Sequence, residues 1–189
     1  KELFPNEPTI EEQWKFINNT KNIRDVTKNY MHLVSWLDQT GEREKIRPLL
    51  VAAPTAVAEN PIVVKLYQDL YPSKEWADNE IALYCGPQFT TWGPRSIENP
   101  EQSFIGGSEE AVIYLSEALA KQGWKVTVYA DPGDQAGEYK GVSWLPYYRF
   151  NARDSFNILV YWRAPGFLDM KCKAKKTYLW CHDVQNPAE

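Results

Sequence analysis

Short apolar runs in the second half of the chain limit its fold more than any other feature. They show little alternation between apolar and polar positions, and β-branched and aromatic residues are frequent in them. Strands of this kind are covered on both faces, which is typical of parallel strands joined by crossovers. The predicted strands are IALYC (81–85), KVTVYA (125–130), VSWL (142–145), NILVYW (157–162) and KTYLWC (176–181).

A predicted helix connects the first two strands. Its sequence, EEAVIYLSEALAKQG, covers 109–123 and ends at Gly123, a common residue at helix C-termini. A strand, a loop, a helix and a strand in this order indicate a Rossmann-like parallel sheet in an α/β domain, which we expect over 80–189. The apolar residues expected on one face of the helix are Ala111, Val112, Leu115, Ala118 and Leu119.

The first 75 residues have a different periodicity and are predicted to be all-helical. Thr9 and Glu12 form a capping box for a first helix, and an apolar stripe from Val26 to Leu37 predicts a second. Pro48 interrupts a third run, and Asn60-Pro61 begins a fourth. The stretch 29–71 loosely resembles tetratricopeptide-type helical repeats, with an irregular helical bundle as the alternative. Residues 71–80 are expected to form a linker.

Charge and cysteine content exclude several classes of protein. The net charge of −4 argues against general nucleic-acid binding, and we interpret the one basic cluster, KCKAKK at 171–176, as a solvated segment. No apolar run is long enough to predict a membrane span. Three cysteines without a C-x-x-C pair favour a reducing, cytoplasmic location, with Cys85 and Cys181 inside buried strands. No His, Cys and carboxylate spacing predicts a metal site.

The ends of the sequence predict a piece of a longer protein. The N-terminal KELFPNEPTIEEQW has neither an initiator Met nor the apolar core of a signal peptide. The C-terminal WCHDVQNPAE stops without a closing element.

Two glycines precede the predicted α/β helix, and they allow two interpretations. Gly106 and Gly107 would let a ligand approach the backbone at a helix N-terminus, where phosphate is attracted, and Ser108 could cap the helix or bind a phosphate oxygen. Glu109 and Glu110 would repel such an anion, so a purely structural turn is the alternative. The G-x-G-x-x-G fingerprint of nicotinamide enzymes is missing, although Asp131 after the second strand could imitate their ribose-binding acid or belong to a DPGD turn.

The loop before these glycines is unusually long and favours a ligand site. GPQFTTWGPRSIENPEQSFI covers about 20 residues (86–105), whereas strand-to-helix connections usually have two to six. Long loops at the carboxyl end of a parallel strand commonly form part of a ligand site. Trp92 in this loop could stack on a sugar ring or close over the core.

Taken in order, several segments resemble the N-terminal Rossmann domain of GT-B glycosyltransferases of the family 4 type (glycosyltransferase group 1). They are IALYC, GPQFTTWGPRS, FIGGSEEAVIYLSEALAKQGWKVTVYADPGD, NILVYWRAP and KKTYLWCHDV, and the resemblance covers 81 to about 187. It implies a nucleotide-sugar donor, retention of anomeric configuration, no bound metal or other cofactor, and a glycan, lipid or protein acceptor. The donor domain of that family has no counterpart here, so the chain is expected to be inactive alone.

The resemblance also implies roles for particular residues. Gly106, Gly107 and Ser108 would contact the donor diphosphate and the acceptor. His182 would project into the cleft near the transferring sugar, and Arg163 would face the same cleft.

By residue type, Glu109 and Asp183 are further cleft candidates as general bases, beside Trp92. Each assignment has a structural alternative: His182 could bond to Asp183 or a loop carbonyl, and Arg163 could form a surface ion pair.

Two other functions remain open. The chain could be a non-catalytic helical scaffold whose degenerate Rossmann domain binds a partner protein, and the helical segment could recruit partners in either case. A nicotinamide-dependent enzyme is a third hypothesis, against which the glycine pattern argues. His32, in the helical segment, is interpreted as a helix-surface residue.

Overall fold

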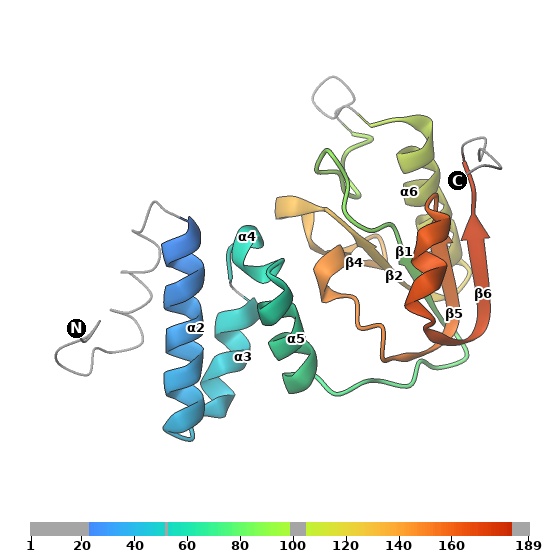
Figure 1. Cartoon of the computed structure of the whole chain (residues 1–189). Helices are drawn as coiled ribbons and strands as arrows, with labels where there is room; N and C mark the ends of the chain where they lie inside the picture. The colour runs from blue at the N-terminus through green and yellow to red at the C-terminus, as the bar shows by residue number, and fades with distance from the viewer. Residues whose placement is uncertain (1–22, 52, 99–104, 183–189) are drawn as a thin grey trace. The chain divides into compact units, whose positions relative to one another are not determined.

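The computed structural model describes residues 23–51, 53–98 and 105–182 (Figure 1). The expected first helix with its Thr9–Glu12 capping box, and the cleft candidate Asp183, lie outside these residues. The chain divides into two compact units, Lys1–Pro72 and Ser73–Glu189, which are described separately. In the described ranges, no helix has both the length and the apolar character needed to cross a membrane.

The described part of the first unit is helical. Asn60 caps α5 by accepting a hydrogen bond from the backbone N–H of Ile62 at 3.0 Å, and Pro61 occupies the first turn. Pro48 lies inside α3, where its ring interrupts the backbone hydrogen bonding without ending the helix. The helices are α2 (Ile23–Gln39), α3 (Arg43–Val51), the unpredicted one-turn α4 (Thr55–Ala58) and α5 (Pro61–Leu70).

The stripe predicted between Val26 and Leu37 forms the centre of this helical unit. Its apolar residues meet those of α3, α4 and α5 in one cluster. His32 points away from the cluster and is exposed. The buried members are Val26, Tyr30, Leu33, Val34, Leu37, Ile46, Leu49, Leu50, Val57 and Val63.

The second unit is a mixed α/β structure around a six-stranded, mostly parallel sheet. The strand pattern of the sequence predicts this class of structure. The strand order is β3-β4-β2-β1-β5-β6, and only β3 is antiparallel to its neighbour. From β1 the chain passes through α6 (Gly107–Lys121) to β2, β3 and β4, which lie on one side of β1. It later returns to add β5 and β6 on the opposite side of β1. The strands are β1 (Glu80–Tyr84), β2 (Lys125–Ala130), β3 (Gly137–Tyr139), β4 (Val142–Pro146), β5 (Ser155–Trp162) and β6 (Lys173–Trp180).

Strand β3 is absent from the sequence-based prediction. It pairs with β4 through the two-residue turn Lys140-Gly141, where both residues have positive φ, 48° and 80°. Turns of this type join antiparallel strands because their twist matches that of the strands. A lysine before the glycine, in place of the usual Asn or Asp, makes this hairpin signal weak.

The two faces of the sheet have separate cores. One face carries Leu83 and Trp144 and is covered by α6. The other carries Tyr84 and Phe156, and its covering segments are the short 3-10 turns η2 (Tyr147–Arg149) and η3 (Pro165–Met170). Neighbouring residues of a strand point to opposite faces, so the uninterrupted apolar runs reflect burial on both sides.

Helix α6 presents only part of its predicted apolar face to the sheet: Val112 is in the core and Leu119 packs against it, as predicted. Val112 and Ile113 are fully buried, but Leu115 is 36% exposed and Ala118 is also exposed. Apolar residues follow one another from 111 to 115, so periodicity alone cannot fix the rotation of the helix. The rotation brings Glu117 to within 3.1 Å of Lys140 in the β3–β4 turn.

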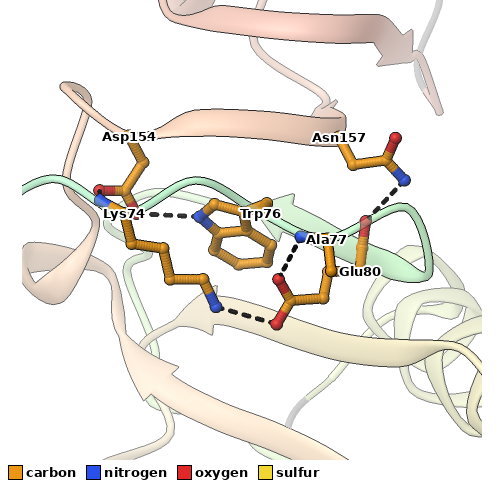
Figure 2. Close-up of polar contacts among 6 residues, drawn as sticks. All are labelled: Lys74, Trp76, Ala77, Glu80, Asp154 and Asn157. Carbon is orange, nitrogen blue, oxygen red and sulfur yellow. Dashed lines mark hydrogen bonds and ion pairs between the residues drawn. The ribbon is translucent and has the colours of Figure 1, made fainter.

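The middle of the expected linker is bound to the sheet. Residues 74–77 run along the start of β5. The backbone N–H of Trp76 donates to the Ser155 carbonyl, and the backbone N–H of Ser155 donates to the Lys74 carbonyl, both at 2.9 Å. The buried carboxylate of Asp154 accepts from the Lys74 backbone N–H and from the Trp76 indole N–H, each at 2.9 Å, and Figure 2 shows the second of these bonds. We call residues 74–77 the strap.

Candidate functional site

The carboxyl ends of β1 and β5 form the edge where a ligand site is expected. These strands are parallel neighbours, but the chain leaves β1 toward β2 and later adds β5 on the opposite side. In open α/β sheets the crevice at such a switch point is where ligands bind. Cys85 and Gly86 follow β1 there, and Arg163 follows β5.

The turn after β1 requires a glycine. Gly86 has a φ of +68°, a conformation that residues with a Cβ rarely adopt. A Cβ at this position would lie 2.4 Å from the ring of Phe167 in η3. The chain therefore turns sharply from β1 into the long loop.

Cys85, just before this turn, is not suited to nucleophilic chemistry. Its side chain is fully buried. Burial, and secondarily the negative charge of Glu109, raise the pKa of the Cys85 thiol far above its ordinary value. Because the thiolate is the reactive form, Cys85 is a core residue.

The first turn of α6 is occupied by the carboxylate of Glu109. Its Oε2 accepts from the backbone N–H of Gly106 at 3.0 Å and from the hydroxyl of Ser108 at 3.1 Å. Its Oε1 accepts from Nη1 of Arg163 at 3.3 Å. A carboxylate of the chain itself thus lies at the helix N-terminus, where the sequence left phosphate binding and a structural turn as alternatives. Beside it, a Cβ at Gly107 would meet no atom of the described residues within 4 Å.

Arg163 reaches this turn from an unusual backbone conformation. Its φ is +66°, and its backbone N–H donates to Trp180 O of the neighbouring strand at 3.0 Å. The guanidinium carbon lies 5.0 Å from the ring centre of Trp162. This conformation turns the chain at the end of β5 and directs the guanidinium to α6.

His182 lies at the same edge, two residues beyond β6. Its ring centre is 4.4 Å from that of Trp180 and 6.0 Å from that of Trp162. Its Nε2 is buried and has no hydrogen-bond partner among the described residues. The structure thus joins Ser108, Glu109 and Arg163 in direct contact and places His182 at the end of the adjacent strand.

Trp92 does not face a cleft. It is 1% exposed and lies between Trp144 and Trp162, with ring centres 5.8 and 5.7 Å away. Its backbone N–H donates to Asp131 O at 2.9 Å, which draws the loop onto the end of β2. Trp92 closes over the core, because the loop folds inward at this residue.

Among the described residues of the long loop, the exposed aromatic side chain is that of Phe89, which is not one of the predicted site residues. Its side chain is fully exposed, whereas Trp92, three residues later, is buried. The loop is held by bonds from the Arg95 backbone N–H to Gln135 Oε1 at 2.8 Å and from the Gly93 backbone N–H to Ser96 Oγ at 3.0 Å. The spacing of two aromatic residues in GPQFTTWG does not show which one points outward.

Asp131 belongs to the turn after β2. The chain continues directly into Pro132 and the 3-10 turn η1 (Gly133–Gln135). Partial burial raises the pKa of the Asp131 carboxyl above its ordinary value. The position fits the DPGD turn considered from the sequence.

Cys181 is exposed, although the sequence predicts it inside a buried strand. β6 ends at Trp180, and most of its side chains are exposed because it is an edge strand. In the described ranges, no three His, Cys, Asp or Glu side chains gather in a way that could hold a metal.

Comparison with known proteins gives no family assignment. No protein-family model, no curated protein and no solved structure matches the chain. We therefore infer a function from the residues at the carboxyl ends of β1, β5 and β6, which we call the carboxyl edge of the sheet.

Proposed function

We propose that the α/β unit is the acceptor-side, Rossmann-like domain of a GT-B glycosyltransferase that uses a nucleotide sugar. The observation that carries this proposal is the convergence of the α6 N-terminus, Arg163 and His182 at the β1–β5 switch point. This edge is the usual ligand position of open α/β sheets. The sequence resemblance to family 4 transferases supplies the reaction class.

The proposed reaction needs a second, donor-binding domain that faces this edge. Gly107 would let a sugar approach the backbone, since no atom of the residues that the structure describes lies within 4 Å of its Cβ position. His182, whose buried Nε2 has no hydrogen-bond partner among the described residues, lies near the transferring sugar in this proposal. Phe89 offers an exposed aromatic face on which an acceptor could stack. The acceptor is a glycan, a lipid or a protein.

The chain's two histidines provide a matched test of this function. The protein that contains this chain, at its natural length, is assayed for sugar transfer or hydrolysis with a panel of nucleotide sugars. His182→Ala is expected to lower turnover about 100-fold, the usual contribution of a positioned acid–base or polar group. His32→Ala, at an exposed position of α2, is expected to leave turnover unchanged.

Two results would count against the proposal. One is the absence of activity with the whole panel in a folded protein. The other is equal activity of the two histidine variants, which would remove His182 from the mechanism.

A hollow in the helical unit favours the second candidate function, a scaffold that binds a partner. It has a volume of about 380 Å³ and is bordered by Asp38, Arg43 and Asp69. An apolar lining with charged residues at its border favours an amphipathic helix as the occupant. Its apolar lining comes from Met31, Val34, Ile46, Leu66 and Leu70.

The scaffold function and the transferase function make opposite predictions. A scaffold would transfer no sugar, and Leu66→Lys would abolish binding of such a helical peptide. A transferase would retain its turnover in the same variant.

A further inference from the structure

We propose that Glu109 closes the N-terminus of α6 to phosphate and holds Arg163 in place, so that this edge discriminates against anionic ligands. The proposal concerns the chain itself. Only its consequence for a nucleotide sugar rests on the proposed function.

The donors that Glu109 engages are of the kinds that bind phosphate, and one of them is the backbone N–H of Gly106, the N-cap residue of α6. Both carboxylate oxygens are used: one accepts from the Gly106 backbone N–H and the Ser108 hydroxyl, and the other from the guanidinium of Arg163. A backbone N–H, a hydroxyl and a guanidinium are the donors that recognise phosphate at helix N-termini. In this structure they converge on an internal carboxylate.

The ion pair between Glu109 and Arg163 is partly shielded from solvent. The Glu109 side chain is 14% exposed and that of Arg163 is 36% exposed. The two residues are 54 positions apart and join the start of α6 to the end of β5. Charges that are partly removed from water interact more strongly than exposed ones.

An entering phosphate would therefore meet an unfavourable environment. It would have to displace the carboxylate from three donors or lie beside it with a charge of the same sign. A hydroxyl group meets no such repulsion, because a carboxylate has about four acceptor positions and can take a further donor. In a transferase, the donor diphosphate would then be held mainly by groups other than the α6 N-terminus.

Phosphate titration of the chain tests this inference. The amide signals of Gly106, Gly107 and Ser108 are followed by nuclear magnetic resonance while inorganic phosphate replaces chloride at constant ionic strength. In the unmodified chain they are expected to show no saturable shift. In Glu109→Gln they are expected to shift saturably, with phosphate affinity raised about tenfold or more.

The neighbouring glutamate provides the control. Glu110→Gln removes the same charge from the same turn, but the carboxylate that accepts from the Gly106 N–H and from Arg163 is that of Glu109, not that of Glu110. It is expected to leave phosphate binding as weak as in the unmodified chain. Saturable phosphate binding in the unmodified chain, or an equal gain in both variants, would overturn the proposal.

A second pair of variants covers the possibility that Glu109→Gln does not fold. Glu109→Asp keeps a favourable charge in the first turn but is too short to bridge Gly106 and Arg163. It should bind phosphate more tightly than Glu110→Asp, and equal binding by the two would contradict the proposal. Because no sugar donor is present, the result does not depend on whether the protein is a transferase.

Discussion

At the first turn of α6, a single carboxylate accepts hydrogen bonds from a glycine N–H, a serine hydroxyl and an arginine. The sequence shows that Gly106, Gly107, Ser108 and Glu109 follow one another, and that a helix begins there. It does not show that Arg163, from a strand 54 residues away, completes the arrangement. Local patterns predict the turn, but the long-range partner depends on the sheet.

Tyr84 gives a residue-scale prediction about alkaline stability. Its ring contacts Phe150 and Phe167, with ring centres 4.4 and 4.9 Å away. Burial, and secondarily charges at Cys172 and Cys85, raise the pKa of Tyr84 to about 12. An unfolded tyrosine has a pKa of about 10. The stability due to the neutral phenol is therefore present below pH ~10 and lost as pH rises from ~10 to ~12, on the order of 2 kcal/mol.

Urea unfolding at a series of alkaline pH values measures this effect. Tyr84→Phe should flatten the decline in the free energy of unfolding over this pH range. Tyr114→Phe, at a ring that is 57% exposed, should leave the decline unchanged. Identical pH profiles for the unmodified chain and Tyr84→Phe would show that Tyr84 is not the cause.

At the scale of single elements, the apolar spacing of the sequence predicts that α6 forms, whereas packing determines which face of the helix is buried. The helix itself is expected from its apolar spacing and from Gly123, and it spans Gly107–Lys121. Its rotation differs from the prediction, because a row of apolar residues leaves several faces possible. The face is decided by contacts with the sheet and with Lys140.

Ile113 and Leu115 test this rotation directly. Ile113→Ala removes a fully buried side chain and should lower the free energy of unfolding by about 2–4 kcal/mol. Leu115→Ala, at a side chain that is 36% exposed, should cost roughly 1 kcal/mol or less. Urea unfolding of both variants decides between the faces, and a larger loss for Leu115→Ala would favour the face expected from the sequence.

The strap gives the second prediction about elements. Asp154→Ala would leave the Lys74 backbone N–H and the buried Trp76 indole N–H without their acceptor. Each buried unpaired donor costs about 1–3 kcal/mol, so a loss of roughly 2–6 kcal/mol is expected for the two. Asp169→Ala, at an exposed position of η3, is the matched control and should change stability by less than about 0.5 kcal/mol.

Tryptophan fluorescence during urea unfolding follows both aspartate variants. If Asp154→Ala unfolds at the same urea concentration as Asp169→Ala, the strap is not held by this carboxylate.

At the scale of the whole molecule, the α/β class follows from the sequence because apolar runs and helical spacing are local properties. The five predicted strands pair in one sheet, with bounds shifted by up to three residues. The unpredicted features depend on distant contacts or weak turn signals. They include β3, the attachment of residues 74–77 to β5 and the exposure of Cys181. Of the candidate site, the residues at strand ends could be predicted, but their mutual contacts could not.

The central claim is that a sugar ligand binds at the carboxyl edge of the sheet. Hydrogen–deuterium exchange of the natural-length protein, with and without a nucleotide sugar and an acceptor, tests it most directly. Slower exchange is predicted in segments 105–112 and 160–182, which contain the α6 N-terminus, Arg163 and His182. Slower exchange confined to the helices from 23 to 70, or no change in any segment, would contradict the claim.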